Sequence, residues 1–167
     1  MVEMDLTERT GADRVAAHSA AEVAWRELGP DALRLAAALV GPHEAHDVTT
    51  SAFLRVTAAQ EWRVVVDQRA YLLRAVRNEA SNLFRARERR WRRDIAAVRP
   101  AAVDPVTVDV DVCRALAKLS LRQRSVVFFA YWHGMTEAEI ADLLELSPGT
   151  IHRDLRMARD RLRKELS

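Results

Sequence analysis

The sequence predicts an all-α protein of two small helical domains joined by a flexible linker, the second domain being a helix-turn-helix. Apolar residues recur at helical spacing through most of the 167 residues, and no sustained alternation is long enough to build a sheet. The segment 99–111, RPAAVDPVTVDVD, has two prolines, three acids and no helical face, which is typical of a linker. We therefore expect one domain over residues 15–95, a linker over 96–111 and a second domain over 112–166.

Composition indicates a soluble globular protein. With 49% hydrophobic and 30% charged residues, the chain contains no stretch near the roughly 18 to 20 uncharged apolar residues that span a bilayer. Glu3, Asp5 and Glu8 precede any apolar run, which is the wrong pattern for a secretory signal. We expect a cytoplasmic protein without membrane insertion, whose single cysteine, Cys113, is a small buried hydrophobe.

Three or four helices are predicted in the first domain. Trp25 and Leu28 are followed by an apolar stripe over residues 33–40, and Gly29-Pro30 and Gly41-Pro42 punctuate this part of the chain. A further helix is expected at about residues 44–57, and a long helix runs from about Asp67 into an arginine-rich stretch. The inward positions of the helix at 44–57 are Val48, Ala52, Phe53 and Val56.

The net charge of +2 conceals a strong segregation of charge along the chain. Acids dominate the first 67 residues, whereas the stretch from Arg69 to Arg93 contains nine arginines against only Glu79 and Glu88. Each phosphate contact by such side chains releases counterions, so a local run of arginines is typical of a surface that binds a polyanion.

Capping signals define the helices of the second domain. Ser120 with Gln123, and Thr136 with Glu139, each show the sequence pattern of a capping box. Ser147-Pro148 opens the last helix, with serine at the N-cap and proline at the first helical position. Because only a short turn separates the last two helices, we predict a helix-turn-helix.

The last helix has an apolar side and a basic side. The apolar side consists of Ile151, Leu155, Ala158, Leu162 and Leu166. The outward or flanking positions are Gly149, His152, Arg153, Arg156 and Arg159. Arginine near the start of a recognition helix bridges guanine O6 and N7 in the major groove, and later arginines reach phosphates. Asp154 either places a negative charge among these positions or orients a neighbouring arginine.

A resemblance to a known family extends over Ala115 to Leu166. This part resembles the promoter-binding C-terminal domain of extracytoplasmic-function (ECF, group 4) sigma factors. It matches in order the RQR, the aromatic-rich helix, the G-[MLF]-[ST]-x-x-E-I-A turn and the S-x-G-T-[IV] opening. The resemblance implies binding to the minus-35 promoter element through Thr150, His152, Arg153 and Arg156, and Arg159 continues the same outer face.

The first half is similar to the same family from about Trp25 to Arg93. The stretch RAYLLRAVRNEASNLFRARERR resembles the helix that binds the minus-10 element, W-L-x-R-I-A-R-N-x-x-x-D-x-x-R-x-x-R-R. The resemblance implies that residues 60–68 form a loop that holds a flipped-out base. In that loop Trp62 is either a stacking wall or a core anchor. The other residues implied to lie near the minus-10 DNA are Arg74, Arg77, Asn78, Asn82 and Arg85.

One stretch departs from the family pattern. The helix that grips core RNA polymerase usually carries D-L-V-Q-E-[VA]-F, whereas this chain reads DVTTSAF over 47–53. Asp47 and Phe53 match, and Thr50 and Ser51 stand at the Gln and Glu positions. Charge-assisted contacts are lost there, which predicts weaker binding to core polymerase.

These patterns predict a transcription initiation factor that binds core RNA polymerase and directs it to specific promoters. The alternative, favoured by DVTTSAF, is a sigma-like DNA-binding regulator that does not itself recruit polymerase. An enzyme is not expected, because the sequence has no paired carboxylates in a readable motif, glycine-rich phosphate loop or nucleophile–base arrangement. We expect no cofactor and no metal, since His43 and His46 lack a third ligand at a readable spacing. The family also implies an anti-sigma factor as a partner.

Overall fold

The computed structural model describes residues 2–93 and 110–166, with side chains over 19–87 and 114–165. Within these ranges every regular element is a helix, so the all-α prediction is confirmed. The elements are α1 (Val2–Val40), α2 (Pro42–Ala58), the 3-10 helix η1 (Gln60–Arg63), α3 (Gln68–Arg93), α4 (Val110–Ala117), α5 (Leu121–Tyr131), α6 (Glu137–Leu144) and α7 (Pro148–Leu166). The linker predicted at 96–111 falls almost wholly outside the described residues.

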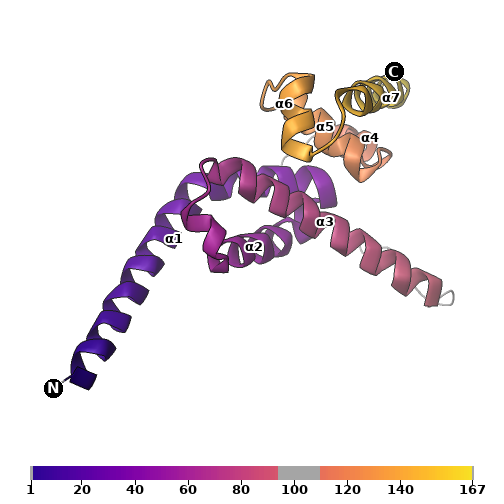
Figure 1. Ribbon diagram of the computed structural model, residues 1–167. Helices are drawn as coiled ribbons and strands as arrows, with labels where there is room; N and C mark the ends of the chain where they lie inside the picture. The colour runs from indigo at the N-terminus through magenta and orange to yellow at the C-terminus, as the bar shows by residue number, and fades with distance from the viewer. Residues whose placement is uncertain (1, 94–109, 167) are drawn as a thin grey trace.

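The first domain is a bundle of α1, α2 and α3, with η1 between the last two (Figure 1). The inward positions predicted for α2 are all buried. Phe53 of α2 is central, because its ring meets Trp25 of α1 edge-on at 4.9 Å between centroids and Trp62 of η1 at 6.4 Å. Edge-to-face contacts of this kind add to the stabilisation from apolar burial, so the aromatic residues fix how the three segments meet.

Gly29-Pro30 does not interrupt α1, although the sequence marks it as punctuation. Proline cannot donate to the carbonyl four residues earlier, which costs about 3 kcal/mol in a helix interior. The residues that follow, Ala32, Leu35, Ala36 and Leu39, have no exposed surface, and their burial outweighs this cost. A Cβ on Gly29 would lie 3.2 Å from the indole of Trp25, so the missing side chain lets that ring lie against the helix.

The second domain begins its helices as predicted. Gln123 N donates to Ser120 Oγ at 3.2 Å, and Ser120 N donates to Gln123 Oε1 at 3.0 Å. Thr136 and Glu139 form the same reciprocal pair at the start of α6, at 3.3 and 2.7 Å. Each bond satisfies a backbone N–H that has no partner within its helix. The core between α5, α6 and α7 is formed by Val126, Phe129, Ile140, Leu144, Ile151 and Leu155.

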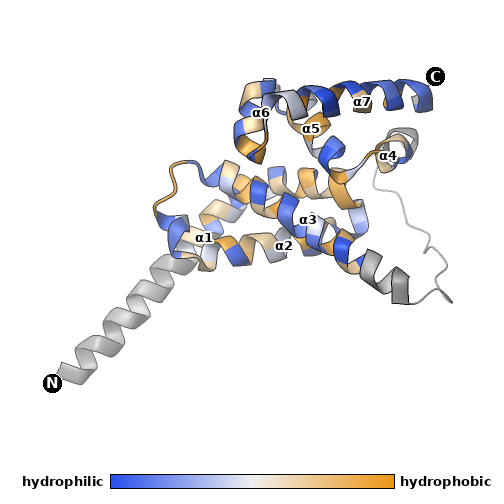
Figure 2. Cartoon of the chain, turned by 45° about the vertical axis from the view of Figure 1, so that its right-hand side comes forward, coloured by the Kyte–Doolittle hydropathy of each residue, from blue (hydrophilic) through white to orange (hydrophobic). Residues whose placement is uncertain are grey.

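The two domains pack against each other and share one apolar core. Figure 1 shows α4 to α7 on one side of the bundle, and α5 contacts both α1 and α3. α6 also contacts α3. In Figure 2 apolar residues gather within the bundle, whereas most of α7 is hydrophilic along its visible side. The second domain is therefore seated on the bundle through α5 and α6, with α7 on the outside.

Candidate nucleic-acid interface

The helix-turn-helix is formed by α6, a three-residue turn and α7. Glu145 ends α6 in the left-handed conformation, with φ 55° and ψ 45°, a region that favours glycine or asparagine. Leu146 N donates to Ala141 O at 2.9 Å and closes the turn. Thr150 N donates to Ser147 Oγ at 3.2 Å, which caps α7 as predicted. These bonds fix the point from which the recognition helix starts.

The inner face of α7 contains a buried acid as well as apolar residues. Ile151, Leu155 and Ala158 are buried, and so is Asp154, which is only 3% exposed. Asp154 accepts hydrogen bonds from Arg122 of α5, from Nε at 2.5 Å and from Nη2 at 3.2 Å. The hydrogen bond to Asp154 raises the pKa of Arg122 despite partial burial. Asp154 is thus not among the outward residues, and the arginine that it pairs with is Arg122 of α5 and not an outward arginine of its own helix.

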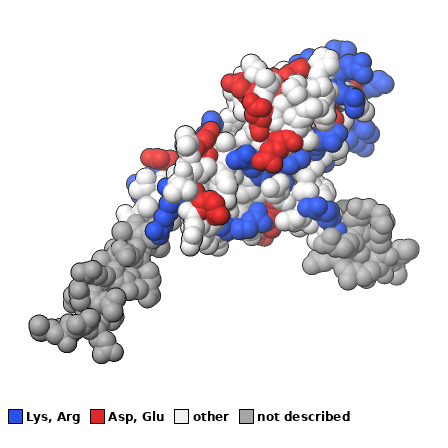
Figure 3. Space-filling view, viewed as in Figure 1, with Lys and Arg blue, Asp and Glu red and all other residues white. Residues whose placement is uncertain are grey.

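The outer face of α7 presents the residues predicted to contact the minus-35 element. His152, Arg153, Arg156 and Arg159 are exposed, and Thr150 is half-buried. Two of them are held by other helices: His152 Nδ1 lies 3.2 Å from Glu137 Oε1 and Oε2, and Arg159 Nε donates to the Tyr131 hydroxyl at 2.6 Å. Figure 3 shows Lys and Arg gathered at the end of the molecule where α7 lies.

The residues predicted for the minus-10 element lie on α3, and the second domain reaches part of this set. Asn78, Asn82 and Arg85 are exposed, whereas Arg74 and Arg77 are half-buried. Arg74 Nη1 lies 3.3 Å from Oε1 of Glu145, the residue that follows α6. Within the described residues Arg77 Nε is buried without a hydrogen-bond partner. Burial, together with the charge of nearby Arg122, lowers the pKa of Arg77.

Trp62 lies inside the first domain rather than on its surface. The residue is 7% exposed, and its ring lies between Phe53 and Tyr71, with centroids at 6.4 and 6.3 Å. Gln68 Nε2 donates to Trp62 O at 3.0 Å and fastens the loop to the start of α3. Of the two roles considered for Trp62, this burial favours the core anchor. The exposed apolar side chains in the loop are Val64 and Val66.

The residues predicted for polymerase binding occupy different environments on α2. Asp47 and Ser51 are exposed and line a cavity of about 390 Å³ between α2 and α3, and Thr50 is half-buried. Phe53 is buried and does not line that cavity, and its predicted role in polymerase binding stays a prediction. Its ring is instead part of the aromatic contact that holds α2 in the bundle.

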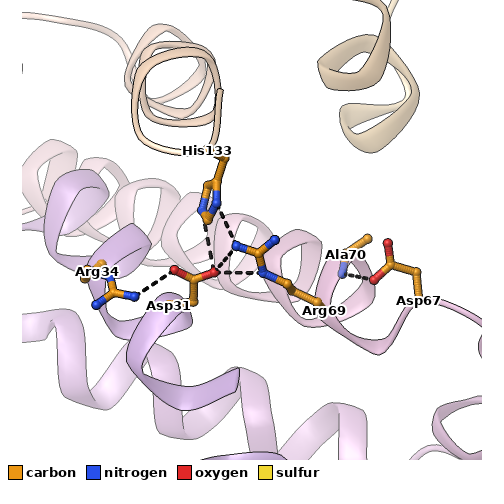
Figure 4. Close-up of polar contacts among 6 residues, drawn as sticks. All are labelled: Asp31, Arg34, Asp67, Arg69, Ala70 and His133. Carbon is orange, nitrogen blue, oxygen red and sulfur yellow. Dashed lines mark hydrogen bonds and ion pairs between the residues drawn. The ribbon is translucent and has the colours of Figure 1, made fainter. Parts of the chain in front are cut away.

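A polar cluster between the domains was not predicted (Figure 4). Arg69 of α3 donates from Nε to Asp31 Oδ2 of α1 at 2.8 Å and from Nη2 to His133 Nδ1 at 2.7 Å. Arg34 donates to Asp31 Oδ1 at 3.0 Å. Burial disfavours the charge on Asp31, but the hydrogen bonds from Arg69 and Arg34 outweigh it and lower its pKa. Burial also lowers the pKa of His133, with Arg69 and Arg34 acting in the same direction and Asp31 opposing them.

Arg124 is a second contact between the domains that the sequence did not assign. Its Nη1 donates to Leu39 O near the end of α1 at 2.5 Å, and its Nε and Nη2 donate to Leu119 O and Ala117 O at 3.1 and 2.9 Å. Its guanidinium lies 5.6 Å from the ring centroid of Phe84 on α3. Burial lowers the pKa of Arg124. The RQR run pointed to this residue, but spacing alone could not show which carbonyls it reaches.

The fold and the basic outer face of α7 define a two-domain protein of the helix-turn-helix class. Residues 24–90 match the family model for sigma-70 region 2, and residues 110–162 match the model for sigma-70 region 4. An RNA polymerase sigma-E factor from Streptomyces avermitilis is 33% identical over 145 residues, which cover 80% of this chain and 78% of that protein. The RNA polymerase sigma-E factor from Streptomyces coelicolor is 32% identical over 145 residues, with the same coverage.

Among solved structures, the chain is similar in fold to the sigma factor RpoE from Bartonella quintana, determined in complex with the anti-sigma factor NepR. The TM-score is 0.74 at 24% identity, and the match covers 87% of this chain and 95% of that one. The chain belongs to the sigma-70 family of RNA polymerase sigma factors and is of the ECF type.

Sigma factors direct RNA polymerase to promoters, so the function predicted from the sequence is confirmed, and the alternative of a regulator that recruits no polymerase is not favoured. The family is one of transcription initiation factors. None of the described helices is long and apolar enough to cross a membrane.

Proposed function

We propose that this sigma factor contacts its promoters at two points, with α7 on the minus-35 element and α3 on the minus-10 element. The observation that carries this proposal is the outer face of α7, where Arg153 and Arg156 are exposed opposite the buried Ile151 and Leu155. An arginine in the major groove identifies guanine, and the remaining cations contact phosphates that position the helix. His152 and Arg159 are held by contacts to α6 and α5, so they support the same face.

On α3, Asn78, Asn82 and Arg85 are the residues proposed to reach the minus-10 strand first, because they are exposed. Arg85 Nη2 donates to Asn82 Oδ1 at 2.9 Å. This bond occupies the amide oxygen and leaves the amide N–H groups of Asn82 to donate to a base. We assign the exposed Val64 and Val66 to apolar contact with the flipped-out base, with Trp62 supporting the loop from inside.

Core polymerase binding is assigned to α2 through Asp47, Thr50 and Ser51. Asp47 offers a charge, whereas the two hydroxyls carry none, so they bind a cationic partner less strongly than the Gln and Glu pattern of the family would. In functional terms residues 15–95 would serve polymerase and minus-10 binding, 96–111 would link, and 112–166 would serve minus-35 binding. By analogy with the RpoE complex, an anti-sigma factor is a proposed partner, and the protein would act without catalysis in the cytoplasm.

Co-purification of the tagged chain with bacterial core RNA polymerase, followed by run-off transcription, tests the polymerase assignment. We expect association and promoter-dependent transcripts. Asp47→Ala should reduce the recovered polymerase, because it removes the one charged group in this set, and Glu61→Ala, an exposed acid on η1, serves as the matched control. Equal recovery with both variants would contradict the assignment of α2.

Substitution of the α7 arginines tests the minus-35 assignment. Arg153→Ala and Arg156→Ala should each weaken binding to a minus-35 duplex by about tenfold or more, since a good bidentate contact to a base contributes roughly 1–3 kcal/mol. Helicity should be unchanged, because both side chains are exposed. Arg26→Ala removes one exposed charge from α1 and is the matched control. Unchanged affinity in both α7 variants would contradict the assignment of this face.

A further inference from the structure

The imidazole of His152, on the outer face of α7, is held by a carboxylate from the neighbouring helix. Its Nδ1 lies 3.2 Å from both carboxylate oxygens of Glu137, in the first turn of α6. The two residues are 15 positions apart in the chain, and the turn between α6 and α7 brings them together. The helix-turn-helix itself therefore sets how this ring is presented.

The Glu137 carboxylate determines which nitrogen of the neutral ring carries the proton. A carboxylate only accepts hydrogen bonds, so Nδ1 must be the donor in this contact. A neutral imidazole has a single N–H, which leaves Nε2 as an acceptor. The side chain of His152 is 70% exposed, and within the described residues its ring makes no further hydrogen bond. The outer face of α7 thus includes a free acceptor at this position.

Stability of the second domain does not explain the pair. The side chains of His152 and Glu137 are 70% and 41% exposed, and exposed ion pairs contribute little to stability. An acid in the first turn favours a helix, but Glu139 already provides one there and closes the capping box. A further acid beside the recognition helix repels phosphates. The specific effect of Glu137 is therefore on what His152 offers to DNA.

The bases differ in whether their major-groove edges donate to an acceptor. Adenine N6 and cytosine N4 are amino groups that donate, whereas guanine and thymine present only acceptors. A free Nε2 acceptor therefore pairs with adenine or cytosine and disfavours guanine and thymine. Arg153 and Arg156 have the opposite preference, because a guanidinium only donates. His152 adds a hydrogen-bond acceptor that the arginines of this face cannot supply.

We propose that Glu137 is a positioning residue for base recognition. It holds His152 with Nε2 as an acceptor, so that the protein selects a base with a major-groove amino group, adenine or cytosine, at the position that the ring meets. This inference rests on the proposed role of α7 at the minus-35 element, and it adds the base class read at one position. Glu137 acts through the ring and not by contact with DNA.

Selection from a library of duplexes tests the base preference. The library has about ten consecutive randomised base pairs, one turn of DNA. It is bound to the full-length protein at about pH 8, above the range in which histidine usually gains a second proton, and the bound DNA is sequenced. The variants are His152→Ala, Glu137→Gln and Glu137→Lys. Asp142→Asn and Asp142→Lys make the same changes of charge at an exposed position of α6 and are the matched controls.

The position that loses its preference in His152→Ala is the one that the ring meets. There we expect the wild type to favour adenine or cytosine by about three- to tenfold, the range for one hydrogen bond. Glu137→Gln should bring this ratio close to one, because an amide both donates and accepts. Glu137→Lys should invert it toward guanine or thymine, because an ammonium only donates and so moves the ring proton to Nε2. Both Asp142 variants should keep the ratio of the wild type.

A ratio of bases at one position is insensitive to the uniform gain in affinity that added positive charge brings. A wild type that favours guanine at this position, or a ratio unchanged in Glu137→Gln and Glu137→Lys, would overturn the proposal and leave the minus-35 assignment intact. If His152→Ala weakens binding to all sequences equally, the ring contacts a phosphate and the proposal also fails. If the lysine variant does not fold, as judged by circular dichroism, the glutamine variant decides. A wild type that selects no sequence would overturn the proposed function of α7 as well.

Discussion

Asp154 is an acid in the middle of a basic recognition helix, and its burial explains how the outer face of α7 stays positive. Its two oxygens accept from Arg122 of α5, and it lies on the same side as Ile151 and Leu155. The pair therefore joins α7 to α5 instead of repelling a phosphate. Sequence spacing alone left both possibilities open, because the partner is 32 residues away in the chain.

Removal of the Asp154 carboxylate should destabilise the second domain. Breaking a fully buried ion pair costs about 3–5 kcal/mol, and since Arg122 is about half exposed, solvent screening reduces the expected loss for Asp154→Ala to about 2 kcal/mol. Denaturant unfolding of the two proteins measures the difference. Asp160→Ala removes an exposed acid from the same helix, and it should lower the free energy of unfolding far less. An equal decrease in the two variants would show that the buried pair does not stabilise the domain more than an exposed acid does.

His133 connects the packing of the domains to pH. Its Nδ1 accepts from Arg69, so the neutral ring carries its proton on Nε2, which lies 3.8 Å from Asp31 Oδ2. Protonation would turn the acceptor into a donor that faces Arg69 and would add a charge near Arg34. Burial, the main cause, lowers the pKa of His133 below its ordinary value of 6.5. The packed state therefore favours the neutral ring.

This shift predicts that acid weakens the packed state. Because its pKa is lowered by packing, His133 binds fewer protons in the packed state than when it is solvated. Its stabilising contribution is complete above the ordinary value of 6.5 and is lost as the pH falls through the lowered value. The free energy of unfolding of the wild type should thus fall more between about pH 7 and about pH 5 than that of His133→Gln.

Asp31 does not change its protonation between about pH 7 and about pH 5, because its pKa is lowered from 3.8. The exposed His46 supplies the control: His46→Gln should keep the pH dependence of the wild type. Identical pH profiles for the wild type and His133→Gln would rule out His133 as the responsive group. The residues themselves could not have been selected from sequence, because a histidine after an aromatic helix has no pattern that indicates burial against an arginine.

At the scale of whole helices, the sequence carried the most information where the signals are local. Both capping boxes, the serine cap of α7 and the buried stripe of α2 follow from spacing within one or two turns, and the structure contains each of them. Of the stripe predicted for α7, Ile151, Leu155 and Ala158 are buried and Leu162 is half-buried, whereas the side chain of Leu166 lies outside the described residues. Gly29-Pro30 suggested an interruption of the helix that the structure does not have. The burial of the residues that follow outweighs the local preference of proline against a helix interior. The left-handed conformation of Glu145 could not be foreseen, because glycine or asparagine usually occupies such a helix end.

The capping box of α5 makes a prediction about stability. Ser120→Ala removes the acceptor for Gln123 N and should destabilise the protein by about 1 kcal/mol, the usual effect of losing a serine cap. The midpoint of urea unfolding would measure it. Ser19→Ala, an exposed serine inside α1, should cause no loss, since alanine is the better helix former there. A Ser120→Ala protein as stable as the wild type would mean that α5 is fixed by packing alone.

At the scale of the whole molecule, two separate domains could be predicted but their mutual arrangement could not. The contacts that set it join residues far apart in the chain: Arg69 to His133 across 64 positions and Arg124 to Leu39 across 85. No periodic pattern in the sequence predicts contacts between residues this far apart. The same arginine run that predicts polyanion binding also supplies the arginines that hold the second domain, so composition alone cannot distinguish the two uses.

Salt dependence distinguishes these two uses of the arginines. A protein with a net charge of only +2 gains little from overall attraction to DNA. A steep fall of DNA affinity with salt concentration must therefore come from local contacts between arginines and phosphates. Each phosphate contact to a single strand adds about 0.7 to the slope of log affinity against log salt concentration. Arg74→Gln and Arg77→Gln should therefore each reduce the slope for a minus-10 oligonucleotide by about 0.7, whereas Arg26→Gln, on the exposed side of α1, should leave it unchanged. A flat dependence in the wild type would mean that the arginines of α3 serve the contact with the second domain and not the promoter.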